Sequence, residues 1–259
     1  MLAAERQARI LVEVRSRGAV KVSDLSRLLN VSEMTIRRDL DSLAAHGRLA
    51  KVHGGATVNG ALSTDEPGFE AKEARQTGEK EAIATMAVQL VRPGSAIGLS
   101  AGTTTWTFAH RLRELTDLTV VTNSIRIAEV LYRAGSQAPH VVLTGGTRTP
   151  SDALVGPIAV SSLNLLHLDQ VFLGVHGMDE QAGFTTPNLL EAEADQALVA
   201  AGRELVVLAD HTKWGIVGLS TIAELAQADV LVTDDGLPEE ARATLAEHVG
   251  ELLVAEAVA

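Results

Sequence analysis

From about residue 96 onward, short aliphatic segments alternate with amphipathic ones, and this alternation restricts the fold more than any other feature. The aliphatic segments have the length and composition of buried strands, and they fall at 96–99, 118–122, 140–144, 171–174, 205–209, 229–233 and 252–254. Helical patterns separate them at 106–114, 125–133, 157–166, 189–201 and 238–248. Buried strands joined by helices form mostly parallel sheets that are covered on both faces. We therefore predict a three-layer α/β domain, which a helix at 79–90 opens.

Glycines, hydroxyl groups and charged side chains follow five of these strands. In open α/β sheets, ligands bind at the carboxyl ends of the strands. Glycine lets the backbone approach a phosphate, hydroxyls can donate to it, and a helix N-terminus favours its negative charge. One such turn is an ordinary strand–helix connection, but five at one sheet edge predict an anion-binding pocket. Its candidate residues are Gly102, Thr103, Thr104, Thr105, Asn123, Ser124, Gly145, Gly146, Arg148, Asp179 and Lys213.

The first 57 residues carry a different pattern, with helix signals at 4–17, at 22–29 and after Ser32. Ser32 can cap the third helix, because its hydroxyl can accept a hydrogen bond from a first-turn N–H. The apolar residues of that helix recur at spacings of four and three, so they share one face: Ile36, Leu40 and Leu43. Two short helices joined by a tight turn at 30–31 predict a helix-turn-helix.

The other faces of the third helix carry groups that can contact DNA. Arginine grips guanine edges or phosphates with a planar fork, and serine or threonine can reach either. Residues 48–56 then resemble a small β-wing with basic residues near phosphates. The candidate DNA-binding residues are Ser32, Glu33, Thr35, Arg37, Arg38, Arg48, Lys51 and His53. The alternative for the helix alone is an amphipathic surface helix with a solvated arginine pair.

The distribution of charge favours a DNA-binding segment in an otherwise acidic chain. The net charge of −11 argues by itself against a nucleic-acid binder. Residues 1–57, however, hold ten lysines and arginines against six acids, a net charge of +4, which leaves −15 for the remainder. A basic head on an acidic body is typical of a DNA-binding domain with a separate sensor.

Composition restricts the remaining possibilities. The chain has no cysteine, which excludes disulfides and thiolate chemistry, and its eight histidines lack metal-ligand spacing, so we expect no metal and no cofactor. No apolar run is long enough to span a bilayer, and we expect a cytoplasmic location with no membrane partner. We expect domains at 1–57 and 78–259, joined by a linker at 58–77. Part of that linker, near 69–75, has a helical charge pattern, but we expect no chemistry from it.

Specific motifs resemble the DeoR family of bacterial transcription regulators. In the first domain they are Val22-Ser23-Asp24-Leu25, Thr35-Ile36-Arg37-Arg38-Asp39-Leu40 and Val52-His53-Gly54-Gly55-Ala56. In the second they include Glu79-Lys80, Gly102-Thr103-Thr104, Val121-Thr122-Asn123-Ser124 and Asp210-His211-Thr212-Lys213. The resemblance implies an N-terminal winged helix-turn-helix and a sugar-phosphate sensor domain similar in fold to ribose-5-phosphate isomerase.

The chain keeps the binding groups of the isomerase pattern but lacks its proton-transfer groups. This chain has His176 where the isomerase motif has aspartate, and no lysine occurs between Lys80 and Lys213. The family usually has aspartate at the position of Ser100. Glu191 and Glu193 could be a remnant base, but exposed helix acids are far commoner. An acid/base site needs its partners in place, so we expect no catalytic residues and no enzyme.

The leading hypothesis is a transcriptional regulator, most often a repressor of carbohydrate-metabolism genes in this family. It would bind double-stranded operator DNA under the control of a phosphorylated sugar. One winged head touches few bases, so specificity requires a homo-oligomer, a dimer or a tetramer. The first alternative is a sugar-phosphate isomerase-like enzyme with a DNA-binding tether. The second is a non-specific architectural DNA binder, which the net acidity disfavours.

Overall fold

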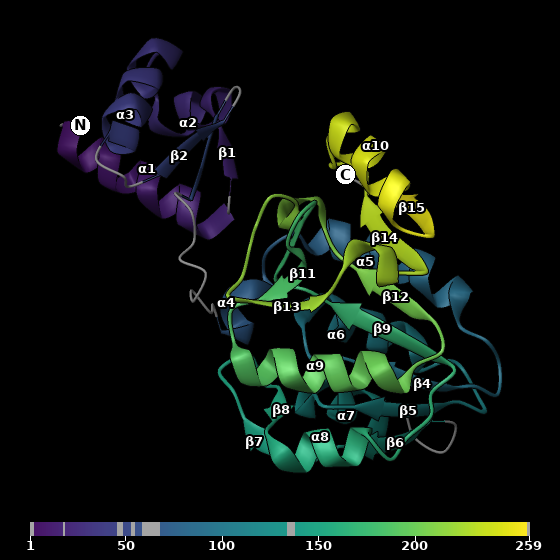
Figure 1. The fold of residues 1–259 in the computed structure, drawn as a ribbon. Helices are drawn as coiled ribbons and strands as arrows, with labels where there is room; N and C mark the ends of the chain where they lie inside the picture. Colours follow the sequence, from purple (N-terminus) through teal and green to yellow (C-terminus); the bar gives the residue numbers. More distant parts are fainter. Residues whose placement is uncertain are drawn as a thin grey trace. The chain divides into compact units, whose positions relative to one another are not determined.

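The computed structural model describes residues 3–17, 19–45, 49–52, 55–58, 68–133 and 138–257. The chain divides into two units, Met1–Leu62 and Ser63–Ala259 (Figure 1). Each unit has its own hydrophobic core, and each is described by itself.

The first unit is the predicted winged helix-turn-helix. Its helices are α1 (Ala3–Arg17), α2 (Val22–Leu29) and α3 (Glu33–Ala45), and its strands are β1 (Ala19–Lys21), β2 (Leu49–Val52) and β3 (Gly55–Val58). The strands form an antiparallel sheet in the order β1-β3-β2. The apolar faces of the helices meet in one core, whose most buried members are Ile10, Val14, Leu25, Ile36 and Leu40. The predicted helices, the shared apolar face of α3 and the strands of the wing are confirmed.

A left-handed residue makes the tight turn between α2 and α3. Asn30 has a φ of 51° and a ψ of 51°, a conformation that asparagine tolerates better than most residues. The N–H of Asn30 donates to the carbonyl of Arg27, and the N–H of Val31 donates to that of Ser26. The turn thereby provides hydrogen-bond donors for carbonyl groups at the end of α2, and it sets the direction in which α3 starts.

The second unit is built on a seven-stranded parallel sheet. Its strands are β4 (Ala96–Leu99), β5 (Thr119–Thr122), β6 (His140–Leu143), β9 (Gln170–Gly174), β12 (Leu205–Leu208), β14 (Val230–Asp234) and β15 (Glu251–Ala255). They lie in the order β15-β14-β12-β9-β4-β5-β6, and every neighbouring pair is parallel. The predicted strands are confirmed to within one or two residues at each end.

Helices cover both faces of this sheet, which gives the predicted three layers (Figure 1). One face packs on α5 (Thr77–Ala87), α6 (Thr103–Leu112) and α7 (Ile125–Tyr132). The other packs on α8 (Pro157–Leu163), α9 (Leu189–Ala201) and α10 (Glu239–His248). Successive residues of β9 alternate between the two cores, because side chains of a strand point to opposite faces. Phe172 enters the first core, while Val171 and Leu173 enter the second.

Several small elements were not expected from the sequence. An antiparallel sheet joins β10 (Gly177–Asp179), β11 (Gly183–Thr186) and β13 (Ser220–Ala223), and β7 (Thr147–Arg148) pairs with β8 (Leu154–Val155). The short helices η3 (His211–Lys213) and η4 (Leu225–Gln227) were not expected either. The helix α4 (Phe69–Glu73), in contrast, lies in the stretch with the helical charge pattern, and η1 (Val88–Leu90) ends the helix predicted at 79–90. The unexpected elements have two to four residues and lack the continuous aliphatic run that marked the strands of the parallel sheet.

Helix α6 begins three residues earlier than predicted. The helix was predicted to start at Trp106, with Thr103, Thr104 and Thr105 in the turn before it. In the structure they form the first turn, where the hydroxyl of Thr105 donates to the carbonyl of Gly102 at 3.1 Å. Only Ser100, Ala101 and Gly102 therefore separate the end of β4 from the N-terminus of α6.

Candidate functional site

The exposed side of α3 presents most of the predicted DNA-binding residues. The hydroxyl of Ser32 accepts a hydrogen bond from the backbone N–H of Thr35 at 3.2 Å, so Ser32 caps the helix as expected. Glu33 and Arg37 form an ion pair one turn apart, with 3.3 Å between Arg37 Nη2 and Glu33 Oε2. Arg38 is exposed beside them. Both arginines thus lie on the solvent side of the helix.

An ion pair to α1 fixes the opposite side of α3. Arg6 Nε donates to Asp39 Oδ2 at 2.5 Å, and Gln7 Nε2 donates to Asp39 Oδ1 at 3.3 Å. Asp39 is only 5% exposed, so these donors satisfy a buried carboxylate. The Arg-Arg-Asp sequence therefore has two roles: Arg37 and Arg38 point outward, while Asp39 orients the helix that carries them.

The predicted wing is only partly described. Strands β2 and β3 pair antiparallel, and Gly55 is needed there because a Cβ would lie 2.1 Å from the carbonyl oxygen of Val20. Lys51 belongs to β2, but its side chain lies outside the described residues, as do Arg48 and His53. The role of these three residues remains a prediction.

In the second unit, a pocket opens where the order of the sheet reverses. The chain runs outward from β4 to β5 and β6, and then returns to add β9 on the other side of β4. Ligands bind at such a switch point, outside the carboxyl ends of the two central strands. The pocket is lined by Lys72, Ala101, Gly102, Thr103, Thr104, Ser151, Gly174, Val175, His176, Thr186, Pro187, Glu191, Asp195, Lys213 and Ile222.

Positive charge gathers at one part of this pocket. The N-cap of α6 is Gly102, which has no side chain to satisfy the first-turn N–H groups. Lys72 and Lys213 both line the pocket. Burial lowers the pKa of His176 to about 4, and the charges of Lys213 and Lys72 act in the same direction. His176 is therefore neutral at physiological pH, and an anion would find a helix N-terminus and two ammonium groups.

Two acids from α9 form another part of the pocket wall. Glu191 Oε1 accepts a hydrogen bond from the hydroxyl of Thr149 at 2.6 Å. Burial, together with the charge of Glu191, raises the pKa of Asp195 well above its usual range. This shift favours the protonated form of Asp195, which can donate as well as accept a hydrogen bond.

Three further predicted pocket residues support its walls without lining it. Asn123 Oδ1 accepts from the N–H of Ala101 at 2.8 Å, which ties the end of β5 to the turn after β4. Ser124 caps α7 by accepting from the N–H of Ile127 at 3.3 Å. Thr105 lies beside Gly174, where a Cβ would meet its methyl group at 3.4 Å.

The other predicted pocket residues lie elsewhere. Asp179 Oδ1 accepts from the N–H groups of Gln181 and Ala182 in the turn between β10 and β11, at 2.9 and 3.0 Å. Arg148 is held on the surface by Asp152 at 2.5 Å. Two glycines with positive φ, Gly145 and Gly146, shape the chain before β7. Local turn chemistry accounts for these four residues, so a strand-end position does not by itself put a residue in the pocket.

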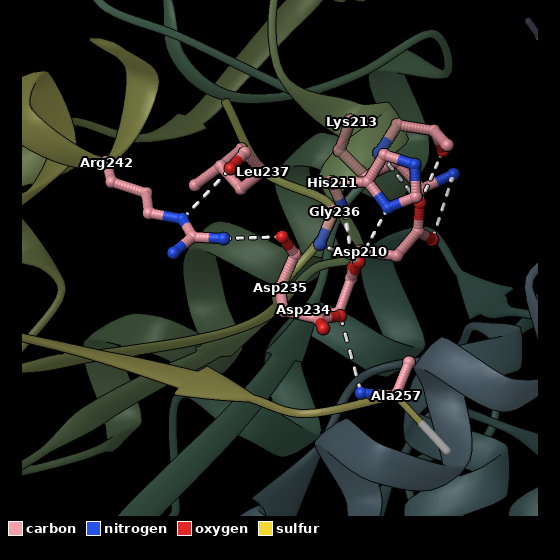
Figure 2. Close-up of polar contacts among 10 residues, drawn as sticks. Asp210, His211, Lys213, Asp234, Asp235, Gly236, Leu237, Arg242 and Ala257 are labelled. Atoms are coloured by element: carbon pink, nitrogen blue, oxygen red, sulfur yellow. Dashed lines mark hydrogen bonds and ion pairs between the residues drawn. The ribbon is translucent and has the colours of Figure 1, made fainter. Parts of the chain in front are cut away.

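A buried polar network joins the ends of β12 and β14 near Lys213 (Figure 2). His211 Nδ1 donates to Asp234 Oδ2 at 2.6 Å, and the N–H of His211 donates to Asp234 Oδ1 at 2.7 Å. The hydrogen bond to Asp234 raises the pKa of His211, although burial opposes it. Asp210 Oδ2 lies 3.9 Å from Lys213 Nζ. The network thus fixes the short helix η3, on which Lys213 stands.

Sequence reasoning missed several residues that line the pocket. Lys72 comes from α4, in the segment expected to be a linker without chemistry, where only a helical charge pattern pointed to order. Ser151 comes from the turn between β7 and β8, which no pattern predicted. Asp195 lies one helical turn after Glu191, a spacing that could have drawn attention to the pair.

Comparisons with known proteins match both units. Residues 6–61 match the model of the DeoR-like helix-turn-helix domain, and residues 75–235 match that of the DeoR C terminal sensor domain. The chain belongs to the DeoR family. As a DeoR-family protein it is a DNA-binding transcriptional regulator.

Relatives of this DeoR protein match along nearly the whole chain. An uncharacterized HTH-type transcriptional regulator YgbI of Escherichia coli K12 is 37% identical over 99% of both chains. A putative aga operon transcriptional repressor of Escherichia coli O157:H7 is 34% identical over 91% of this chain and 88% of its own. The HTH-type transcriptional regulator GlpR of Haloferax volcanii is 35% identical over 93% of this chain and 94% of its own.

Among solved structures, ribose 5-phosphate isomerase A of Neisseria gonorrhoeae is similar over 53% of both chains, with a TM-score of 0.38 and 20% identity. A likeness at this level says nothing about substrate or activity. Among the residues that the structure describes, no three His, Asp or Glu side chains gather closely enough to hold a metal ion. Within the same ranges, no helix combines the length and apolarity needed to cross a membrane.

Proposed function

We propose that this DeoR-family regulator binds operator DNA through α3 and that a phosphorylated sugar in the pocket controls its affinity for that DNA. The observation that carries the proposal is the pocket at the switch point of the sheet. It combines a helix N-terminus and two lysines with two carboxyl groups. An anionic group and a polyol would each find matching partners there.

The phosphate would bind at the N-terminus of α6. First-turn N–H groups and the helix dipole favour an anion at such an end. The Thr103 and Thr104 hydroxyls can donate to phosphate oxygens, and the ammonium groups of Lys72 and Lys213 add charge-assisted bonds. The neutral imidazole of His176 carries no charge but can donate one hydrogen bond to the phosphate.

The sugar would lie toward α9. Hydroxyl groups both donate and accept hydrogen bonds, so they match a carboxylate beside a protonated carboxylic acid. Glu191 would accept from a hydroxyl, and Asp195 would donate to one. We propose that the pocket binds its ligand without converting it, because Asp179, expected at the site, is engaged in the β10–β11 turn instead.

The DNA-binding unit would work as part of a homo-oligomer. A single recognition helix contacts few base pairs, and pairing two heads on repeated half-sites multiplies specificity. We propose at least a dimer, in which Ser32, Glu33, Thr35, Arg37 and Arg38 enter the major groove and Arg48, Lys51 and His53 contact phosphates. Because the operator would be chromosomal DNA, we place this action in the cytoplasm.

A melting experiment tests the pocket. Sugar phosphates should raise the melting temperature of the full-length protein, since a ligand at 100 times its Kd stabilises the folded state by about 2.7 kcal/mol. The corresponding free sugars should have little effect, because they lack the group that the helix end and the lysines bind. Thr104→Val and Lys213→Ala should reduce the shift.

Thr107→Val is the matched control for these variants. Thr107 is on the same helix, but its hydroxyl donates to the carbonyl of Thr103 at 3.0 Å and does not line the pocket. This variant should respond like the parent. Equal shifts with free and phosphorylated sugars, or a full response in Thr104→Val and Lys213→Ala, would place the effector elsewhere.

A further inference from the structure

Helix α4 is the first described element of the sensor unit after β3 of the DNA-binding unit. Five residues are too few for a stable helix in isolation, so its position depends on contacts with the rest of the unit. Phe69 is 2% exposed and packs edge-on against Trp106 of α6, with ring centroids 5.7 Å apart. Arg126 of α7 lies over the Phe69 ring at 4.2 Å and binds Glu70 at 3.0 Å.

A buried lysine fixes the other end of α4. Lys80 is 3% exposed, and its Nζ donates to the carbonyls of Lys72 and Arg75 at 2.6 and 2.5 Å. The ammonium group thereby joins the last turn of α4 to the residues just after it, at the end of a helix where a positive charge is favourable. Burial lowers the pKa of Lys80 to about 8, although Asp210 opposes the shift. Helix α4 is thus held at both of its ends.

Between these two anchors, α4 contributes Lys72 to the pocket. Lys72 Nζ donates to the hydroxyl of Ser151 at 3.1 Å, and both side chains line the pocket. Ser151 lies in the turn between β7 and β8. A second tie joins the same turn to α4, because Arg126 binds both Asp152 of the turn and Glu70 of the helix.

This turn is held in an unusual conformation. Asp152 has a φ of 63°, in the left-handed region, which aspartate enters more often than most residues but which is still uncommon outside glycine. Such a residue persists only where its surroundings impose it, and here Arg126 and Arg148 grip its carboxylate. The hydroxyl of Thr149, in the same turn, binds Glu191 of the pocket wall. A ligand that contacts Lys72, Ser151 or Glu191 therefore acts on both the turn and α4.

We propose that Lys72 binds the effector's phosphate directly. We also propose that a change in how α4 is held transmits ligand binding to the DNA-binding unit. The inference rests on the proposed function, because it assigns the route by which the same pocket regulates operator affinity. A phosphate dianion accepts more strongly than a serine hydroxyl, so the Lys72 ammonium moves toward it and its hydrogen bond to Ser151 weakens. This tie between α4 and the turn is then weaker, and the remaining contacts hold α4 differently.

Two lysine variants separate ligand binding from coupling. Lys72→Met and Lys213→Met each remove one ammonium group from the pocket while keeping an unbranched side chain. Each should weaken the binding of a sugar phosphate about 10- to 100-fold, the usual effect of losing one charge-assisted bond. At saturating ligand, Lys213→Met should keep the parent's change in operator affinity, whereas Lys72→Met should show almost none. Lys72→Arg keeps the charge and should keep the coupling.

The measurement uses the full-length protein and a labelled operator duplex selected from a random library. The ligand is the member of a panel that most raises the parent's melting temperature: ribose 5-phosphate, fructose 1-phosphate, fructose 6-phosphate or glucose 6-phosphate. Fluorescence gives a second readout in a Trp214→Phe background, where Trp106 reports its contact with Phe69. The ligand should change Trp106 emission in the parent and in Lys213→Met, but not in Lys72→Met.

The outcomes distinguish the two proposals. If no member of the panel stabilises the parent, the proposed function fails and this inference fails with it. If the parent responds and saturated Lys72→Met changes operator affinity equally, the proposed function stands and the route through α4 is rejected. Loss of coupling in Lys72→Arg would also reject it, because the charge that binds phosphate is still present.

Discussion

At the scale of single residues, the structure distinguishes residues that line the pocket from residues that have the same kind of sequence signal but lie elsewhere. Thr103, Thr104 and Lys213 follow strands and line the pocket, as their positions predicted. Asp179 has the same kind of position, but its carboxylate is occupied by its own turn. Sequence spacing indicates which residues reach the strand ends, whereas the local hydrogen bonds decide which of them line the pocket.

Asp195 provides a prediction at this scale. Burial and Glu191 raise its pKa, so the folded state binds a proton that the unfolded state has lost above its usual value of 3.8. Stability contributed by this group therefore falls as pH rises above 3.8. Asp195→Asn, which resembles the protonated acid, should raise the free energy of unfolding at pH 8 and have less effect at pH 4.

Urea denaturation at the two pH values measures this difference. The same variant should bind the sugar phosphate about as well as the parent, because an amide also donates a hydrogen bond. Asp195→Ala should lose about 1–3 kcal/mol of binding free energy, the cost of leaving a partner unsatisfied. A destabilised Asp195→Asn at pH 8 would mean that the carboxyl group is ionised in the pocket.

At the scale of elements, the sequence predicted the aliphatic strands and the long helices and missed the small antiparallel strands. Strand β12 is short but wholly aliphatic, and helix α9 is long and has its predicted bounds. Strands β11 and β13 pair through Phe184 with Ala223 and Thr186 with Ser220, a long-range pairing that no local pattern encodes. Helix α4 depends on Phe69 and Lys80 contacts that only the folded unit supplies.

The link between β12 and β14 should be sensitive to pH. Asp234 raises the pKa of His211 above 6.5 in the folded state. The stability from this pair is therefore fully present below pH 6.5 and is lost as pH rises through the folded pKa. His211→Asn should cost more free energy of unfolding at pH 6 than at pH 9.

Urea denaturation at both pH values checks this, with His140→Asn as the control, since His140 is exposed on β6. This variant measures what replacing an exposed histidine by asparagine costs at each pH, against which His211→Asn is compared. If His211→Asn costs the same at pH 6 and pH 9, the imidazolium form does not contribute to the link between the strands.

At the scale of the whole molecule, the two proposed sites lie in different units of one chain. The net charge of +4 in residues 1–57 and −15 elsewhere confines attraction for DNA to the first unit. The α/β fold of the second unit and the location of its pocket followed from the order of strands and turns. Coupling between the units was predicted from the sequence, but the route proposed for it was not, because Lys72 lies in a segment without a recognisable motif.

Reciprocal titration of the two ligands tests the central claim most directly. Operator affinity is measured with and without saturating sugar phosphate, and sugar-phosphate affinity with and without operator, at fixed salt. The account predicts that both change by the same factor, about 5–150, because coupling between two sites is reciprocal. An Arg37→Ala, Arg38→Ala double variant should lose operator binding, about 1–3 kcal/mol per base-reading arginine, yet keep its sugar-phosphate affinity. Operator affinity that is unchanged by a sugar phosphate bound at saturation would contradict the account.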